Sequence, residues 1–344
     1  MDASQIADTD TPMLEARVIR ELLVDDSAGS LGQAHLSAAS GLVKLGNRLF
    51  VVTDDEHHVA MFDLSNREPG RLIPIFDGEL PLRHKARKAA KPDCEALLML
   101  PAFSAYPNGA LMAMGSGSRP SRHRGALLAL DAAGGVQVPV RILDLTALLA
   151  PLHDHFPDLN IEGAFVQGDT LSLLQRGNSG SAINARIDLS WVDLQRWLTA
   201  AGPAPEPASI TRFELGAIDG VALSFTDGAA LPSGDWLFSA AAEDTTDTYS
   251  DGHCAGSVIG LVDAGGTIRT LQRLAEPFKV EGIAASGAGD MIDLLLVTDA
   301  DDRRQPALLL STKLHRMSRA VAVVRPRVVQ SDPEENSNAH PRPR

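Results

Sequence analysis

Acidic side chains recur at one position of a repeated pattern, and they are the residues best suited to chemistry. Four segments align: PDCEALLML (92–100), LNIEGAFVQ (159–167), GAIDGVALS (216–224) and FKVEGIAAS (278–286). Each aligned acid precedes Gly or Ala and then an apolar run; these acids are Glu95, Glu162, Asp219 and Glu281. A fifth copy at 37–45 carries Ser40 in this position. Copies arranged around an axis would therefore form a ring of carboxylates.

Carboxylates that converge on one axis repel one another, so such a ring either keeps protons or recruits a cation. Ca²⁺ takes about six to eight oxygen ligands from carboxylates, amides, carbonyls and water. We therefore predict bound calcium, and the candidate ligands are Glu95, Glu162, Asp219, Glu281 and Asn178. The two cysteines and the histidines show no zinc spacing. The alternative is structural: each acid accepts hydrogen bonds from the backbone of the next repeat.

Three residues are candidates for catalysis. Glu162 and Glu281 keep a full Glu-Gly pair, and Arg176 lies in QRGN after an apolar strand. Arg176 either orients a ligand or pairs with a ring acid. Together these residues favour a calcium-dependent hydrolase of a phosphoester, ester or lactone, in which a carboxylate transfers the proton. The alternative is a non-catalytic ligand-binding or scaffold protein with a structural ion or none.

Two basic segments, RHKARKAAK (83–91) and SRPSRHR (118–124), would lie on the same face as the acids. Basic side chains there suit a small anionic substrate, although they also suit solvated loops that balance an acidic chain. Motifs of serine hydrolases, zinc proteases and nucleotide-binding loops are missing from the sequence.

The elements that position these residues are short apolar runs. In each repeat, the acid-bearing strand is followed by further runs bounded by turn residues, as in RLFVVTDD and VAMFDL of the first repeat. Four antiparallel strands per repeat and five repeats predict an all-β, five-bladed β-propeller. Six blades, a sandwich and two smaller β domains are the alternatives. Short helices are expected at 145–156 and 190–202.

The last repeat lacks a clear fourth strand, and the segment ARVIRELL (16–23) offers one. We therefore expect the N-terminal strand to close the ring, which removes exposed sheet edges. The segment at 321–326 competes for this role. The expected organisation is a flexible N-terminus (1–14), one propeller domain (15–330) and a disordered tail (331–344).

The formal net charge of −13 argues against nucleic acid and anionic membrane surfaces as partners. Two cysteines without a disulfide framework favour a reducing compartment. The first residues lack a signal peptide, and no apolar run is long enough for a membrane helix. We expect a cytoplasmic monomer that acts on a small molecule.

The motifs NIEG, LQRGN, AEDT and VEGIA are similar to those of an uncharacterised group of bacterial proteins of unknown function, over about residues 15–325. More distantly, the recurring Glu-Gly resembles the SdiA-regulated, esterase-like phytase, gluconolactonase and paraoxonase propellers. In the last two groups, a Glu in such a position binds the catalytic metal, which implies Glu95, Glu162 or Glu281 as ligands. Those lactonases have six blades, and their Asn and Asp ligands are not matched in this sequence.

Overall fold

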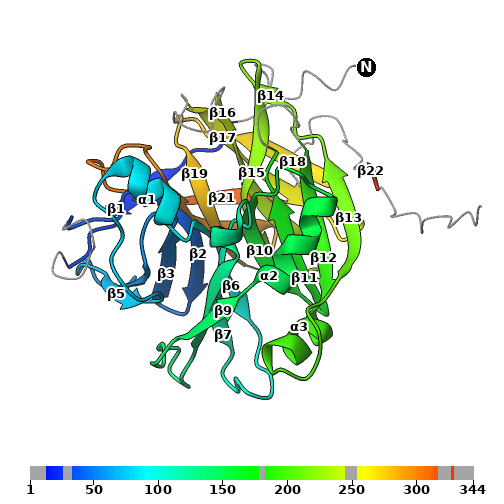
Figure 1. The fold of residues 1–344 in the computed structure, drawn as a ribbon. Coiled ribbons are helices and arrows are strands. Elements are labelled where there is room, and N and C mark those ends of the chain that lie inside the picture. The colour runs from blue at the N-terminus through cyan, green and yellow to red at the C-terminus, as the bar shows by residue number, and fades with distance from the viewer. Residues whose placement is uncertain are drawn as a thin grey trace, which may run out of the picture.

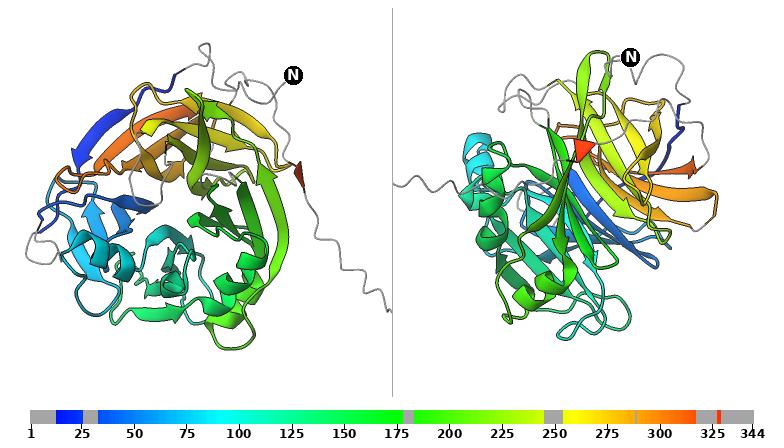
Figure 2. Two further views of the ribbon diagram at one scale, coloured as in Figure 1. Left: turned by 45° about the horizontal axis from the view of Figure 1, so that its top comes forward. Right: turned by 90° about the vertical axis from the view of Figure 1, so that its right-hand side faces the viewer.

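The computed structural model describes residues 13–25, 33–177, 183–244, 254–287, 289–316 and 327–328. These residues form five antiparallel sheets that are arranged in a ring around a central axis, as Figure 2 shows. The five-bladed β-propeller is therefore confirmed, and the six-bladed alternative is wrong. Helices in the described ranges have at most eight residues.

The blades follow one another along the chain (Figure 1), and each begins with its innermost strand. Blade 1 contains β2 (Ala39–Leu45), β3 (Arg48–Thr53), β4 (His58–Asp63) and β5 (Arg71–Pro74). Blade 2 contains β6 (Cys94–Leu100), β7 (Ala110–Gly115), β8 (Arg124–Ala129) and β9 (Arg141–Asp144). Blade 3 contains β10 (Ile161–Gln167), β11 (Thr170–Gln175), β12 (Asn184–Ser190) and β13 (Pro207–Phe213).

Blade 4 contains β15 (Val221–Ala230), β16 (Trp236–Glu243), β17 (Cys254–Val262) and β18 (Ile268–Arg273), with the short β14 (Ala217–Ile218) paired to the start of β15. Blade 5 contains β19 (Val280–Ser286), β20 (Met291–Thr298) and β21 (Leu308–His315), and its outer strand is β1 (Arg17–Glu21).

The ring closes through this N-terminal strand. β1 pairs antiparallel with β21, from Arg17 opposite Ser311 to Glu21 opposite Leu308. The expected closure is confirmed, and Figure 2 shows the blue strand beside the orange strands of blade 5. Residues 321–326 lie outside the described residues, as do 1–12 and 329–344. β22 (Arg327–Val328) pairs with β13 of blade 3 instead.

Alternate residues of the inner strands pack against different neighbours. β7 is buried at every residue. Its Met112 belongs to the apolar cluster shared with blade 3, whereas its Leu111 belongs to the cluster shared with blade 1. A strand that is covered on both faces needs an apolar run without alternation, which explains the runs seen in the sequence.

The innermost strand of every blade has a β-bulge, which lies near the start of the strand in four blades and in the middle of β15 in blade 4. The bulged residues are Ser40, Glu95, Glu162, Thr226 and Glu281. In blades 1, 3 and 5 the residue after the bulge is a glycine, which allows neighbouring inner strands to approach closely. A Cβ atom on Gly163 would lie 2.7 Å from the Cα atom of Asp227, and one on Gly282 would lie 2.7 Å from the carbonyl oxygen of Ser40. The Gly of the Glu-Gly pair therefore serves packing between blades.

The structural alignment corrects the repeat in blade 4. Thr226, not Asp219, is the bulged residue, because β15 and β16 extend further beyond the mouth than the inner strands of the other blades. Asp219 lies in the turn between β14 and β15 with a φ of 51°, and its side chain is 72% exposed. The predicted ring position of Asp219 is therefore wrong by seven residues.

Short helices occupy the connections. The predicted helices correspond to α2 (Thr146–Leu149), η3 (Ala150–Asp154) and α3 (Trp191–Leu198), the last capped by the hydroxyl of Ser190. The basic segments also contain α1 (His84–Ala90) and η2 (Pro120–Arg122). Arg87 anchors α1: its side chain is fully buried and donates to the carbonyl oxygen of Asp55 at 2.6 Å and to the Glu56 carboxylate at 2.6 Å.

Candidate functional site

One mouth of the ring is a charged cavity of about 560 Å³. It lies where the innermost strands begin and the second strands end, so each blade brings polar groups to it. In blade 4 the contributing residue is Glu243 at the end of β16, and the bulged residue does not line the cavity. Its acidic residues are Asp54, Asp55, Asp93, Glu95, Asp158, Glu162, Glu243, Glu281, Asp299, Asp301 and Asp302. Its basic residues are Lys88, Lys91, Arg119, Arg122, Arg176, Lys279 and Arg303. The predicted gathering of acidic and basic segments on one face is thus present.

The three bulged glutamates line this cavity and influence one another. Burial raises the pKa of Glu162 to about 7, because the opposing pull of Arg176 only partly offsets it and Glu281 adds repulsion. Burial and the neighbouring Glu162 raise the pKa of Glu95 well above its usual value. Burial also raises the pKa of Glu281 despite Lys279 and Arg176. The site therefore contains three carboxyl groups with raised pKa values, and that of Glu162 lies near neutral pH.

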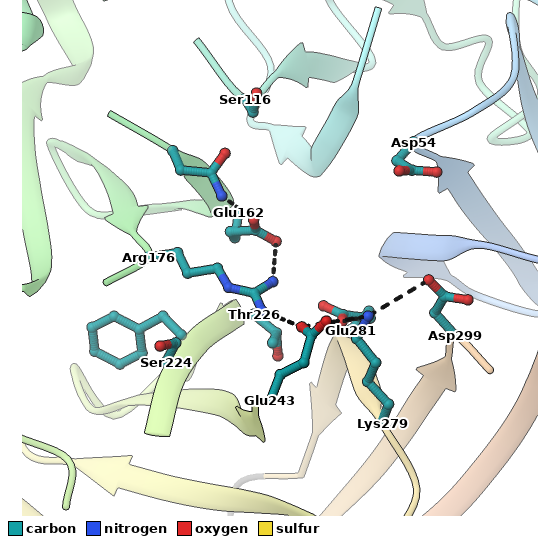
Figure 3. A network of polar contacts seen from close by, with 12 residues as sticks. Asp54, Ser116, Glu162, Arg176, Ser224, Thr226, Glu243, Lys279, Glu281 and Asp299 are labelled. Atoms are coloured by element: carbon teal, nitrogen blue, oxygen red, sulfur yellow. Dashed lines mark hydrogen bonds and ion pairs between the residues drawn. The ribbon is translucent and has the colours of Figure 1, made fainter. Parts of the chain in front are cut away.

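Lys279 is the centre of charge on one side of the mouth. Its ammonium lies 2.6 Å from Asp301, 3.3 Å from Glu281, 3.6 Å from Glu243 and 3.8 Å from Asp299. Burial would lower the pKa of Lys279, but these carboxylates outweigh it and hold the pKa well above its usual value. Figure 3 shows the ammonium pointing into the cluster.

Arg176 links this cluster to blade 3. Its guanidinium donates to Glu243 Oε2 at 2.5 Å and lies 3.5 Å from Glu162 Oε2 (Figure 3). The other oxygen of Glu162 accepts from Asn160 Nδ2. Arg176 therefore pairs with the ring acid Glu162 and with Glu243, and it also lines the cavity.

Asp93 is the centre of charge on the opposite side. Its carboxylate accepts from the Ser116 hydroxyl at 2.6 Å and pairs with Lys91 at 2.9 Å and Arg122 at 2.7 Å. Burial would raise the pKa of Asp93, but Lys91 and Arg122 outweigh it and hold the pKa below its usual value. Asp93 therefore connects the two basic segments through Lys91 and Arg122. Lys91 also pairs with Asp54.

A cation could be held by oxygens of Asp54, Asp93 and Glu95, since one oxygen of each lies within 4.8 Å of the others. Oδ1 of Asp54 is buried and has no hydrogen-bond partner among the described residues. The donor set is carboxylate oxygen alone, which fits a hard cation such as Ca²⁺. Lys91 already supplies one positive charge there.

Some of the predicted site residues line the cavity, and others do not. Glu95, Glu162, Glu281 and Arg176 line the cavity. Asp219 does not; it is exposed and lies 3.5 Å from Arg273. Asn178 lies outside the described residues.

The structural role considered for the ring acids belongs to Asp227, directly after the bulge of blade 4. Its Oδ2 accepts from the backbone N–H of Ile283 in blade 5 at 3.0 Å.

Sequence reasoning missed Asp93 and Lys279, which stand two residues before the bulged glutamates of their blades. The corresponding residues elsewhere are Ala38, Asn160 and Ser224. The signal that could have found them is the position two residues before the bulge, which is polar in every blade except blade 1.

Residues 35–314 match the model of a family described as a family of unknown function, DUF6929. The chain belongs to this family. The expected membership of an uncharacterised family is thereby confirmed. No match is found among curated proteins.

Solved structures show similarity in fold at low identity. An α-L-arabinofuranosidase from Fusarium graminearum is 9% identical, with a TM-score of 0.40 and coverage of 87% of this chain and 98% of that one. A luciferin-regenerating enzyme is 8% identical, with a TM-score of 0.38 and coverage of 87% and 94%. The tail fibre of Staphylococcus aureus phage P68 is 10% identical, with a TM-score of 0.41; the match covers 88% of this chain and about half, 53%, of the fibre chain.

Within the described ranges, no helix combines the length and apolar character needed to cross a membrane.

Proposed function

We propose that the charged mouth is the active site of a hydrolase for a small substrate with an ester-type bond, namely a phosphoester, ester or lactone. The observation that carries this proposal is the convergence of Glu95, Glu162 and Glu281 on one cavity that also contains basic side chains. A cavity of this size accommodates a small molecule, and convergent polar groups with perturbed pKa values are typical of catalytic sites.

Glu162 is the proton-transfer group in this proposal. Its pKa of about 7 gives it both the ionised form, which accepts a proton from water, and the protonated form, which donates to a leaving oxygen. Arg176 and Asn160 hold its two oxygens in place. Glu281 lies close enough to raise the pKa of Glu162, so ionisation of one carboxyl group makes ionisation of the other less favourable.

Calcium is part of the proposal, with Asp54, Asp93 and Glu95 as its ligands. When bound, Ca²⁺ supplies polarisation of a substrate oxygen and a lower pKa for bound water. The buried Oδ1 of Asp54, which has no hydrogen-bond partner within the part of the chain that the structure describes, supports a cation at this position.

The test is a panel of phosphoester, carboxylic ester and lactone substrates with purified protein, before and after chelation. Glu162→Gln should lower kcat by about 100-fold or more, because general acid–base catalysis contributes that much. Asp219→Asn is the matched control, since it makes the same charge change outside the cavity. Equal activity of both variants, or turnover of no substrate in the panel, would contradict the proposal. Metal analysis and melting with and without chelator test the calcium separately.

A second candidate is a non-catalytic ligand-binding propeller. The observation that favours it is the internal neutralisation of the acids: Lys279 contacts four carboxylates, and Arg176 contacts two. Such a network of ion pairs can hold ligand-binding groups in place without taking part in a reaction. Ligand binding that Glu162→Gln leaves intact, with no turnover by the wild type, would favour this candidate.

A further inference from the structure

Gln175, which precedes Arg176 in the sequence motif QRGN, is the last residue of β11 and does not line the cavity. It is 3% exposed, and both ends of its side-chain amide are hydrogen-bonded. The amide oxygen accepts from the backbone N–H of Asn160 at 2.8 Å. The amide nitrogen donates to the carbonyl oxygens of Asp158, at 3.2 Å, and of Arg176. Gln175 therefore connects the segment before β10 to the residue after β11.

The two residues that Gln175 connects are also the two that hold the carboxyl group of Glu162. Asn160 donates from Nδ2 to Glu162 Oε1, and the Arg176 guanidinium lies 3.5 Å from Glu162 Oε2 (Figure 3). The backbone N–H of Arg176 in turn donates to the carbonyl oxygen of Asn160 at 2.9 Å. The backbones of both partners of Glu162 are thus bonded to each other and to one buried side chain.

The other blades are built without such a side chain. Gln175 is opposite Ile161, the residue directly before the bulged Glu162. The residues at this register position in the other blades are Thr53, Gly115, Ala240 and Thr298. All four are smaller than glutamine, and none carries an amide in its side chain. The blade frame therefore does not require an amide at this position, and the feature that accompanies it in blade 3 is the pair of residues bonded to Glu162.

We infer that Gln175 is a positioning residue for Glu162, which it fixes through Asn160 and Arg176. This inference rests on the proposed function, because Glu162 is the proton-transfer group there. Gln175 does not contact a substrate, since it is buried and lies outside the cavity lining. A small displacement of a catalytic group lowers the rate of the chemical step strongly. Loss of Gln175 should therefore lower kcat and kcat/KM by equal factors and leave KM unchanged.

Gln167 provides a matched control on the same blade. It is the last residue of β10 and does not line the cavity. Its side-chain amide donates to the carbonyl oxygens of Leu231 at 3.3 Å and of Asp235 at 2.7 Å. Gln175→Met and Gln167→Met therefore both remove an amide that bonds to the backbone and replace it with a flexible apolar side chain. Only the first removes bonds to the two partners of Glu162.

The test combines NMR of the nitrogen-labelled full chain with turnover of the substrate that the panel identifies. Gln175→Met should shift the signals of the Asn160 side-chain amide and of the Arg176 guanidinium. It should also lower kcat by roughly 10- to 100-fold. Gln167→Met should leave both signals and kcat as in the wild type. If Gln175→Met fails to fold, Gln175→Asn replaces it, because its shorter side chain keeps the amide but not the reach to both segments.

Unchanged signals of Asn160 and Arg176, equal effects of both methionine variants, or a raised KM with kcat intact would overturn this role of Gln175. Failure of the hydrolase proposal has a different signature. In that case the wild type turns over no substrate of the panel, while the two signals still respond to Gln175→Met and not to Gln167→Met. The NMR measurement therefore tests the positioning of Glu162 separately from the reaction.

Discussion

Asp93 and Lys279 occupy the same position in two blades, two residues before the bulged glutamate, yet they carry opposite charges. Asp93 is an acid surrounded by Lys91 and Arg122, and Lys279 is a base surrounded by four acids. One repeated frame thus gives a base-rich side at blade 2 and an acid-rich side at blades 4 and 5. The propeller fold places this residue at the mouth, whereas the sign of its buried charge determines which charged side chains surround it.

The first test of this comparison removes the positive charge of Lys279. Lys279→Met should lower the free energy of unfolding by about 3–5 kcal/mol, because it leaves buried carboxylates without their counter-charge. The loss should shrink at acid pH, where those carboxylates become protonated. Urea unfolding measures it, and Lys313→Met, whose side chain is 65% exposed, is the control. A loss below about 1 kcal/mol would show that Lys279 does not hold the acid-rich side.

The pH dependence of stability sharpens the comparison next. Glu162 has a folded pKa of about 7 and a usual value of 4.5, so the folded state binds its proton more tightly. Its contribution to stability is therefore full below about pH 4.5 and is lost as the pH rises to about 7. Glu162→Gln should remove this slope, a change on the order of 3 kcal/mol across the window. Parallel curves for both proteins would contradict the raised pKa.

The central acid should behave with the opposite sign. The pKa of Asp93 is held low, so its stabilisation is present at neutral pH and is lost as the pH falls below its unfolded value of about 3.9. Asp93→Asn should cost about 2 kcal/mol at neutral pH, since it weakens charge-assisted bonds to Lys91 and Arg122. Urea unfolding at several pH values measures this cost, and Asp293→Asn on the exposed surface is the control. A cost that grows toward acid pH would contradict the assignment.

The sequence predicted the strands and the positions of the glutamates better than it predicted the ion pairs. Apolar runs covered on both faces revealed the strands, and the Glu-Gly pairs placed Glu95, Glu162 and Glu281 at the mouth. The pairing of Lys279 could not be predicted, because its partners come from the ends of β16 and β20 in two blades. Helix α1 was missed for a similar reason: it is fixed by buried Arg87, whose partners lie about thirty residues earlier in the chain, at Asp55 and Glu56.

Blade 4 misled the alignment because Asp219-Gly220 imitates the Glu-Gly pair while serving a turn. The true equivalent, Thr226, donates to the carbonyl oxygen of Val280 in blade 5 at 2.8 Å. Its neighbour Asp227 accepts from Ile283 of the same blade. In this blade the bulge position is used for contact between blades, so blade 4, like blade 1 with Ser40, adds no acid to the ring.

The smallest predicted effect tests this register. Asp219→Asn should change the free energy of unfolding by less than about 0.5 kcal/mol, because the side chain is exposed and Asn tolerates a positive φ. Thr226→Val should cost about 1 kcal/mol, since it removes a buried hydrogen bond to blade 5 while keeping the volume. Urea unfolding of the two variants measures the difference. If Asp219→Asn proved the more costly, blade 4 would have the register that its sequence suggests, and its acid would belong to the ring.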